Sequence, residues 1–371
     1  MIRHIFGLLV LTVLLGSCSR PGAKKPDFNG EELIHEAKYL SLKDCGDFLY
    51  AEVYAPWSDS LPLSRYMIAD SLPADIEVPD GVTLIGKPLR RTIVSSSIYT
   101  SGLDELGLIN TVAGVTDGNY YIPSDPIYSR LRGEAVTDIG SSMAPSIEKA
   151  VDLAPDGVVI SPYEGGGLSD LEKIGVPVVL MTDYLEASPL GRAEWILLLG
   201  AAYGKLDEAR AVYASVKERY EGLARRVAGA QPKPKVLSER PMSGVWYVPG
   251  GDSYVARMFA DAGAVSPWSD QHVTGSIPLD EASVIDRAAD ADFWLVKNDK
   301  DLTAKALEAE FPHARAFKAY PEGVYFTNTL QKPYFNAIAY HPERVLADLV
   351  AIFHPELADS AYTLEFYEKL K

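Results

Sequence analysis

The stretch from residue 206 to residue 227 constrains the fold more than any other part of the chain. Its apolar residues recur at alternating steps of three and four: Leu206, Ala209, Tyr213, Val216, Tyr220, Leu223 and Val227. This spacing predicts one amphipathic α-helix, about 33 Å long at ~1.5 Å per residue. Acidic residues in its first turn and arginines in its last suit the helix dipole. Three heptads would also fit a coiled-coil seam, but the flanking sequence is globular, which favours a rigid strut between two lobes.

Short apolar runs and amphipathic stretches alternate on both sides of this strut. Before it, we expect strands at 92–95, 111–115, 157–160 and 176–181, with helices at 98–108, 148–154, 168–174 and 193–203. After it, we expect strands at 235–238 and 292–296, with helices at 253–262, 279–288, 303–310, 342–353 and 361–370. The prediction is an α/β fold: two lobes with mainly parallel sheets, joined by one long rigid helix, with a ligand cleft between the lobes.

The rest of the chain completes the expected domain organisation. Residues 36–54 read as a β-hairpin and residues 64–69 as a further strand. The expected parts are a signal peptide at 1–18, a tether and β-rich lead-in at 19–88, an N-terminal lobe at 89–204, the connecting helix at 205–229 and a C-terminal lobe at 230–371. A formal charge of −16 without a basic patch argues against a nucleic-acid partner.

The N-terminus predicts an export signal. Arg3 precedes a short apolar run over residues 5–15, which is too short to cross a bilayer as a mature helix. The following Leu15-Gly16-Ser17-Cys18 looks like a bacterial lipobox, which implies cleavage before Cys18 and acylation of its thiol. The protein would then be lipid-anchored, in the periplasm or at the outer face of the cell membrane. The alternative is an ordinary signal peptide with an incidental cysteine. Cys45 has no partner for an internal disulfide.

Six short motifs in order, together with the strut, carry a family resemblance. They are Val112-Ala113-Gly114-Val115, Asp138-Ile139-Gly140, Ile147-Glu148-Lys149, Ala154-Pro155-Asp156, Ile174-Gly175-Val176-Pro177-Val178 and Asp261-Ala262-Gly263-Ala264. Their order resembles the helical-backbone (class III) periplasmic substrate-binding proteins of ABC importers, which carry iron–siderophore complexes, haem or cobalamin. The resemblance implies two α/β lobes with little hinge motion, a metal-chelate ligand, a dimeric ABC permease as partner and no enzymatic activity. We also expect a monomer.

The loops expected at the carboxyl ends of the strands are rich in aromatic residues. Flat ring faces suit a large planar or conjugated ligand, and a cationic side chain would pair with an anionic chelate. The candidate ligand-binding residues are Tyr99, Tyr120, Tyr121, Tyr163, Glu164, Tyr184, Arg240, Trp246, Tyr247, Trp268, His272 and Tyr334. Any one of these aromatic residues could instead pack in a core, and Lys297 is a further cation that could equally be a solvated surface charge. Gly250-Gly251 before Ser253 is either a modest anion site or a plain helix cap.

No motif for a cofactor or for catalysis is found. There is no HxH, HExxH, GxSxG, P-loop or GxGxxG pattern, so we expect neither a resident cofactor nor a directly bound metal ion. Among ligands, an iron–siderophore complex is favoured, then cobalamin, then haem, for which a Tyr or His could serve as axial ligand. A chelatase-like enzyme and a surface lipoprotein without a ligand remain alternatives of other classes.

Glu148 and Glu281 each begin a predicted helix at matching places in the two halves. In the resembled family, this pair of positions carries surface glutamates that meet arginines on the permease subunits. The resemblance therefore implies that Glu148 and Glu281 dock the permease. The alternative is that each carboxylate only stabilises the start of its helix.

Overall fold

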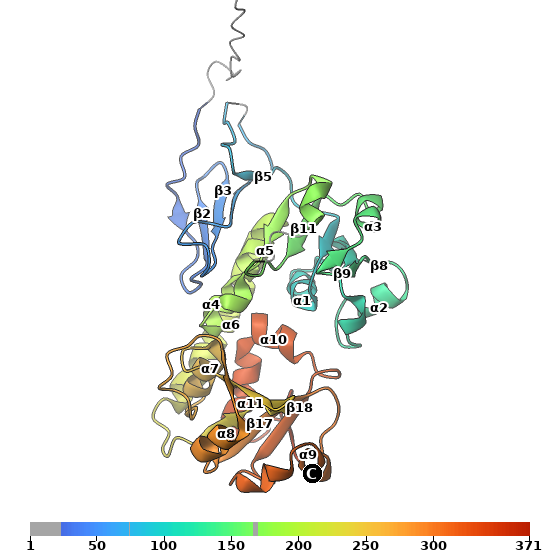
Figure 1. The fold of residues 1–371 in the computed structure, drawn as a ribbon. Coiled ribbons are helices and arrows are strands. Elements are labelled where there is room, and N and C mark those ends of the chain that lie inside the picture. Colours follow the sequence, from blue (N-terminus) through green and yellow to red (C-terminus); the bar gives the residue numbers. More distant parts are fainter. Residues whose placement is uncertain (1–23, 74, 166–169) are drawn as a thin grey trace, which may run out of the picture.

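The computed structural model describes residues 24–73, 75–165 and 170–371 of the chain. They form a small lead-in sheet, an N-terminal lobe and a C-terminal lobe, with long helices running between the lobes (Figure 1). The anchor candidate Cys18 lies outside the described residues. Among the helices that are described, none combines the length and the apolar character needed to cross a bilayer.

The predicted strut is helix α6 (Leu206–Val227), and both of its ends agree with the expectation. Ala209, Tyr213, Val216, Tyr220 and Val227 are buried, so the apolar stripe faces inward. The helix packs against α5 (Ile196–Ala202) and α11 (Pro342–Phe353) of the same chain. Its stripe is therefore fully used inside the fold, and the coiled-coil alternative is wrong.

The N-terminal lobe is built on a five-stranded sheet in the order β12-β11-β6-β7-β8, all parallel. Its strands are β6 (Thr92–Val94), β7 (Val112–Val115), β8 (Thr137–Asp138), β11 (Gly157–Ile160) and β12 (Val178–Leu180). Its helices are α1 (Ser97–Glu105), α2 (Tyr128–Arg132), α3 (Ile147–Asp152), α4 (Pro189–Glu194) and α5. A separate short pair of strands consists of β9 (Gly140–Ser141) and β10 (Ala144–Pro145). Central strands such as β11 are buried on both faces, as parallel strands between helices must be.

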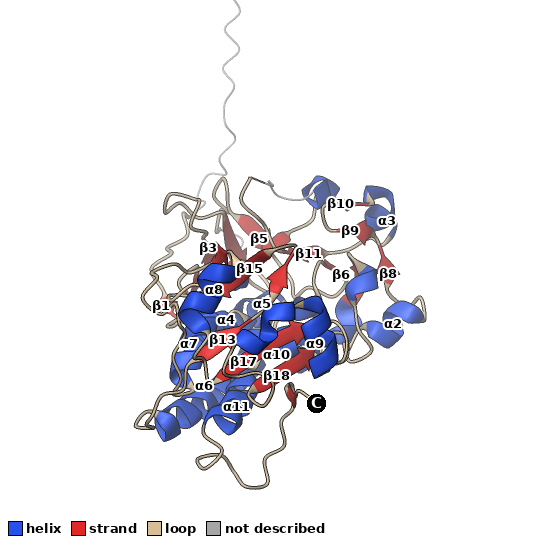
Figure 2. Cartoon of the chain, turned by 60° about the horizontal axis from the view of Figure 1, so that its bottom comes forward, coloured by secondary structure: helices blue, strands red, loops and turns tan. Residues whose placement is uncertain are grey.

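The C-terminal lobe contains two sheets. In the first, β13 (Val236–Ser238), β17 (Phe293–Asn298) and β18 (Val324–Asn328) are parallel, and β19 (Glu368–Lys369) is antiparallel at the edge. The second is antiparallel: β14 (Pro241–Met242), β15 (Val245–Pro249) and β16 (Ser276–Leu279). Helices α7 (Tyr254–Asp261), α8 (Glu281–Ala288), α9 (Ala304–Glu310), α10 (Tyr334–Tyr340) and α11 surround them (Figure 2).

Strand β17 separates two cores in this lobe. Leu295 belongs to the core that also contains α6, α10 and α11. Trp294 and Val296 point the other way, into a second core that includes side chains from α8, α9 and β15. Alternation along one strand thus joins the C-terminal lobe to the strut while giving it a core of its own.

The lead-in is a sheet of β1 (Glu31–Glu32), β2 (Leu40–Asp44), β3 (Leu49–Val53), β4 (Ser64–Ile68) and β5 (Thr83–Ile85). The predicted hairpin is β2–β3. The Tyr66 hydroxyl donates to the carbonyl of Val178 and accepts from the N–H of Leu180, both at 2.9 Å. These two groups lie on the free edge of β12, so the lead-in caps the edge of the N-terminal lobe's sheet.

Helix α10 ties the two lobes together. Asn336 donates from Nδ2 to Oδ1 of Asp125 in the N-terminal lobe at 2.7 Å, and Ser97 donates to Asn336 Oδ1 at 3.2 Å. All three residues lie within the inter-lobe region that α10 fills against α1 and α4. A lobe rotation would have to break these buried polar contacts, so the packing opposes hinge motion.

A polar cluster of Glu105, Arg219, His341 and Glu343, called the His341 clasp below, connects the end of α10 to the strut. His341 lies 3.3 Å from Glu105 of α1 and 3.2 Å from Glu343, which also accepts from Arg219 of α6 at 2.9 Å. Burial disfavours the charged form of His341, but the neighbouring carboxylates outweigh it and raise the pKa of its imidazole. One charge network therefore connects the N-terminal lobe, the strut and the C-terminal lobe.

Two predicted helices differ in the structure. Of the helix expected at 168–174, residues 168 and 169 lie outside the described residues, and Asp170–Ile174 form a 3₁₀ helix. The closing helix expected at 361–370 is wrong. That segment is extended because the buried Asp348 carboxylate accepts the N–H groups of Glu365, Phe366 and Tyr367. Such a tertiary contact outweighs local helix propensity.

Candidate ligand-binding site

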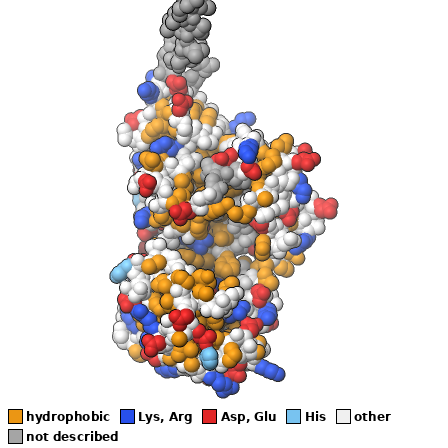
Figure 3. Space-filling model, viewed as in Figure 1, with side chains coloured by type: hydrophobic (Ala, Val, Ile, Leu, Met, Phe, Trp, Pro, Cys, Tyr) orange, Lys and Arg blue, Asp and Glu red, His pale blue; other side chains and the backbone are white. Residues whose placement is uncertain are grey.

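A cavity of about 630 Å³ lies between the lobes, which is within the usual size range for a small-molecule site. Its N-terminal wall is the loop after β12, with Tyr184, Leu185 and Glu186. Its C-terminal wall comes from four places: the end of β13, the β14–β15 hairpin, the start of α7 and the end of β17. The side chains on this wall include Glu239, Arg240, Met242, Tyr247, Tyr254 and Lys297. Hydrophobic side chains gather around the hollow between the lobes (Figure 3).

Three tyrosines give this cavity its aromatic character. Tyr184 is 38% exposed, and its hydroxyl donates to the carbonyl of Pro162 at 2.6 Å, which fixes the ring in the loop after β12. Tyr247 is 47% exposed on β15, and Tyr254 opens helix α7. Partial burial raises the pKa of Tyr184, so its hydroxyl is neutral at physiological pH. The walls can therefore offer ring faces to a ligand.

The cations of the cavity are already paired. Lys297 forms a short ion pair with Glu239, and its ammonium lies 6.0 Å from the centre of the Tyr334 ring. Arg240 donates to Glu310 at 2.8 Å and to Asn298 at 2.9 Å. Burial disfavours the charge on Lys297, but the Glu239 carboxylate outweighs this and raises the pKa of the lysine. A strongly anionic ligand would have to share these cations with the protein's own carboxylates.

A buried polar triad lies beside Tyr254. Asp183 accepts from the hydroxyl of Tyr99 at 3.0 Å and from Nε of Arg192 at 3.1 Å. The Arg192 guanidinium lies 5.4 Å from the centre of the Tyr254 ring. Burial and the Asp183 charge both raise the pKa of Tyr99, so its hydroxyl stays protonated. This triad holds the α7 tyrosine against the N-terminal lobe across the domain boundary.

The twelve sequence-predicted ligand residues separate into three groups. Tyr184, Arg240 and Tyr247 line the cavity. Tyr120, Tyr163, Glu164 and His272 are exposed but do not line it, and His272 instead contacts Asp252 at 3.3 Å. Tyr99, Tyr121, Trp246, Trp268 and Tyr334 are buried in the protein interior. None of these five lines the cavity, and each ring packs against protein, so this structure does not place them where they would contact a ligand there.

Trp246 shows why the prediction misassigned it. Its side chain is 0% exposed and packs among Trp294, Phe311 and Phe317, and its indole N–H donates to the carbonyl of Ser238 at 3.0 Å. Its neighbour Tyr247 points to the opposite face of β15, because successive strand residues alternate. Trp268 is buried in the same core. The sequence shows two adjacent aromatic residues but not which face of the strand meets the cleft.

The glycine pair before α7 does not form an anion site. The N–H groups of Gly250, Gly251 and Asp252 donate to the carbonyls of Gly275, Gln271 and Val273 at 2.8–3.1 Å. The Ser253 hydroxyl caps the helix by accepting from the N–H of Ala256. The glycines serve close packing, since a Cβ on Gly250 would lie 2.2 Å from the carbonyl oxygen of Val273.

Among the lining residues that sequence reasoning missed are Pro56, Glu186, Glu239, Met242 and Tyr254. Tyr254 directly follows the capping residue Ser253. This position after a helix cap is the sequence signal that could have identified it as a ring at the start of a helix. Lys297, for which a surface charge was an open alternative, is partly buried at the cavity wall. No signal short of the tertiary structure places the lead-in residue Pro56 beside the lobes.

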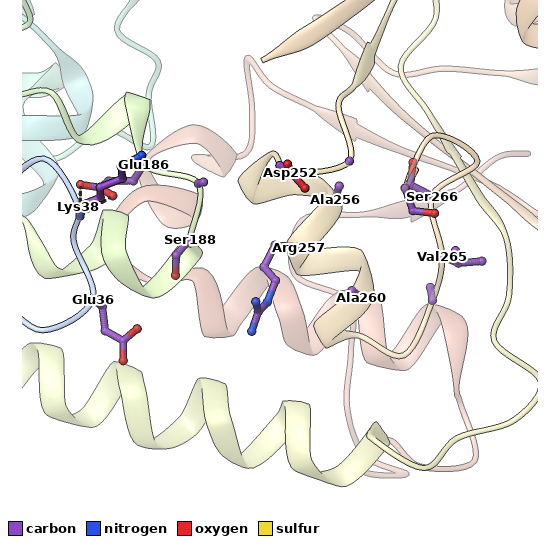
Figure 4. A pocket seen from close by; sticks show the side chains of 14 residues that line it. Glu36, Lys38, Glu186, Ser188, Asp252, Ala256, Arg257, Ala260, Val265 and Ser266 are labelled. Atoms are coloured by element: carbon purple, nitrogen blue, oxygen red, sulfur yellow. Dashed lines mark hydrogen bonds between the residues drawn. The ribbon is translucent and has the colours of Figure 1, made fainter. Parts of the chain in front are cut away.

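A second cavity of about 440 Å³ borders the first and shares Glu186 with it. Figure 4 shows Glu36, Lys38, Glu186 and Ser188 on one side, and Asp252, which precedes α7, and the α7 residue Arg257 on the other. Its charged groups are already engaged: Glu36 with Lys217, Arg257 with Asp261, and Glu186 with the N–H of Lys38. None of the described residues that line it is aromatic, and we therefore take the aromatic cavity of about 630 Å³ as the candidate site.

The described residues contain no cluster of three or more His, Cys, Asp and Glu side chains that could hold a metal ion.

The two candidate docking glutamates differ in how exposed they are. Glu148 is exposed at the start of α3, whereas Glu281 at the start of α8 is partly buried and forms a short contact with His313.

Residues 93–326 match a family model described as "Periplasmic binding protein". A lipoprotein of Methanocaldococcus jannaschii is 29% identical over 288 residues, which cover 75% of this chain and 68% of that protein. A periplasmic haem-binding protein from Pseudomonas aeruginosa is 19% identical, with a TM-score of 0.58 over 76% of this chain and 98% of its own. A Staphylococcus epidermidis protein described as a possible iron-binding, periplasmic solute-binding protein is 16% identical, with a TM-score of 0.56 over 72% of this chain and 100% of its own. The two structural likenesses show that the two-lobed fold is shared.

Replacing Trp246 tests its place in the core. Trp246→Ala removes a fully buried ring, so we expect the free energy of unfolding to fall by about 3–5 kcal/mol. Tyr247→Ala, one residue further along the same strand, is the matched control and should change it by less than about 1 kcal/mol. Guanidinium denaturation of the three proteins measures both values. An alanine variant at 246 as stable as the wild type would contradict the assignment.

Proposed function

We propose that this chain, which belongs to the periplasmic binding protein family, captures a metal chelate and delivers it to the permease of an ABC importer. The family binds solutes for transport and is not a family of enzymes. The observation that carries the proposal is the aromatic cavity between the carboxyl ends of the two lobes' strands. Open α/β sheets bind their ligands at this edge.

The chemistry of the walls favours a chelate over a bare metal ion. Tyr184, Tyr247 and Tyr254 supply ring faces that can pack against a conjugated or planar ligand, and no cluster of metal-ligating side chains was found in the part of the chain that is described. An iron–siderophore complex is the favoured ligand, and its negative groups would share Lys297 and Arg240 with Glu239 and Glu310. Cobalamin and haem are the alternatives. For haem, the lining tyrosines are the available axial ligands, because no histidine is found among the described residues that line the cavity.

The inter-lobe packing supports capture without large domain closure. Helix α10 and the His341 clasp hold the lobes at a set distance, so the cavity exists before a ligand arrives. A preformed site loses less conformational entropy on binding than a site that must be assembled. The expected mode is therefore binding into an open, shaped cleft.

Titration of the full-length chain, purified in detergent, tests the proposed function. The panel is a ferric trihydroxamate, a ferric tris-catecholate, haemin and cyanocobalamin, each followed by equilibrium dialysis and absorbance. We expect saturable binding of one member, and at least about tenfold weaker binding by the double variant Tyr184→Ala/Tyr247→Ala, because buried aromatic contacts are typical hot spots. Tyr120→Ala, on an 80% exposed ring away from the cavity, is the control. Failure of the intact protein to bind any of the four would remove the proposal.

The lipid anchor at Cys18 is also a proposal. It is supported by the lipobox-like sequence before Cys18, by the lipoprotein name of the relative, and by the extracytoplasmic location of the family. In the native host, Cys18→Ala should abolish incorporation of labelled palmitate and remove the protein from the membrane fraction. Persistent labelling of the variant would show that acylation occurs elsewhere.

Docking of the permease through Glu148 and Glu281 is supported by their positions at the starts of α3 and α8, one in each lobe. Exposed charges act mainly on encounter, so reversing one charge should weaken uptake mildly and in a salt-dependent way. Reversal of both, Glu148→Arg with Glu281→Arg, should abolish uptake of the chelate by cells while leaving its affinity for the purified protein unchanged. Normal uptake by the double variant would exclude this docking role, and lost affinity would place the residues in the ligand site.

A further inference from the structure

The lead-in sheet reaches the inter-lobe cleft with the loop between β3 and β4, residues 54–63. Pro56 in this loop lines the cavity of about 630 Å³ together with Tyr184, Leu185 and Glu186. The family match begins at residue 93, so this part of the cavity wall lies outside the region that the match covers. The cavity therefore has a contribution from a segment that the family match does not cover.

The loop is held at the cleft by specific hydrogen bonds. The hydroxyl of Thr182, in the segment after β12, donates to the carbonyl of Tyr54 at 2.9 Å. Within the loop, the Ser58 hydroxyl donates to the carbonyl of Ala55 at 2.8 Å, and the N–H of Leu63 donates to the carbonyl of Val53 at 2.7 Å. Ala55 is buried, so Pro56 follows a residue that is anchored in the fold. The position of Pro56 at the cavity is thus defined by the structure around it.

A second segment of the lead-in is fixed to the same place. The Glu186 carboxylate accepts from the N–H groups of Lys38 and Tyr39 at 2.9–3.0 Å and from the indole N–H of Trp195 at 3.0 Å. Glu186 itself lines both cavities, and Lys38 lines the smaller one (Figure 4). Because Leu40 pairs with Val53, the two lead-in segments lie at the same end of their sheet. That end of the sheet therefore contributes Pro56 to the larger of these two cavities and Glu36 and Lys38 to the smaller one.

We propose that the loop of residues 55–62 is a third wall of the ligand site and determines which chelates fit. This inference rests on the proposed function. The loop, Ala55-Pro56-Trp57-Ser58-Asp59-Ser60-Leu61-Pro62, carries a single charged residue, and Leu61 is 67% exposed. Pro56 lines the cavity and the loop also carries Trp57 and Leu61, apolar side chains of the kind that contact the apolar periphery of a bulky chelate. The other two walls would orient the ligand through their rings and paired charges.

A loop replacement tests the third wall. In the full-length chain, residues 56–61 are replaced by two glycines, and the chelate panel of the previous section is titrated again. For the chelate that the wild type binds, we expect at least about tenfold weaker binding and a smaller preference over the other panel members. The matched control replaces Cys45-Gly46-Asp47, the turn at the other end of the same sheet, by three glycines and should bind as the wild type does. Pro56→Trp enlarges a single side chain at the cavity wall and is the second test, which is needed if the loop replacement fails to fold. We expect it to weaken binding at least about tenfold.

The outcomes separate the two proposals. Wild-type affinity and wild-type preference in both a folded loop replacement and Pro56→Trp would overturn the third wall while leaving the proposed function intact. A wild-type chain that binds no member of the panel would overturn the proposed function, and the third wall with it. Equal weakening by the control turn replacement would show that the lead-in acts through stability rather than at the cleft, which also overturns the inference.

Discussion

Continuous apolar packing through the middle of the molecule is the constraint on which the rest of the structure depends. One core joins the lead-in sheet, the N-terminal sheet, helix α6, helices α10 and α11, and one face of the C-terminal sheet. No boundary in this core would let the two lobes part without exposing apolar surface to water. The distance between the lobes, and hence the cavity between them, is set by that packing rather than by a ligand.

Buried carboxylates hold the loops around this core by accepting several N–H groups each. Glu194 accepts from the N–H groups of His35, Glu36 and Ala37, and Glu186 accepts from those of Lys38 and Tyr39. Asp348 does the same for the C-terminal segment from Glu365 to Tyr367. A buried charge is stable only when hydrogen bonds replace its lost water, so each carboxylate specifies the path of the segment it binds. The chain uses this device where regular secondary structure does not fix the path.

The candidate site could be predicted in its general character but not in its membership. Tyr184, in the loop after β12, and Tyr247, within β15, both line the cavity, whereas Trp246 and Trp268 lie in the core. Sequence spacing cannot assign the face of a short strand when both faces are aromatic, because the period of two fits either register. The Gly250-Gly251 pair raised the same difficulty, because the sequence does not show whether a backbone N–H is exposed or already hydrogen-bonded.

What the sequence determined by itself was the helix α6, the alternation of strands and helices on either side of it, and the two-lobed α/β class. These features depend on the local periodicity of apolar residues, which can be read from neighbouring positions without knowledge of distant residues. Only the tertiary structure decided that residues 361–370 are extended, that α10 bridges the lobes, and that Pro56 of the lead-in borders the cleft. Each of these depends on contacts between segments far apart in the sequence, whose burial and hydrogen bonding outweigh the weak conformational preferences of the residues involved.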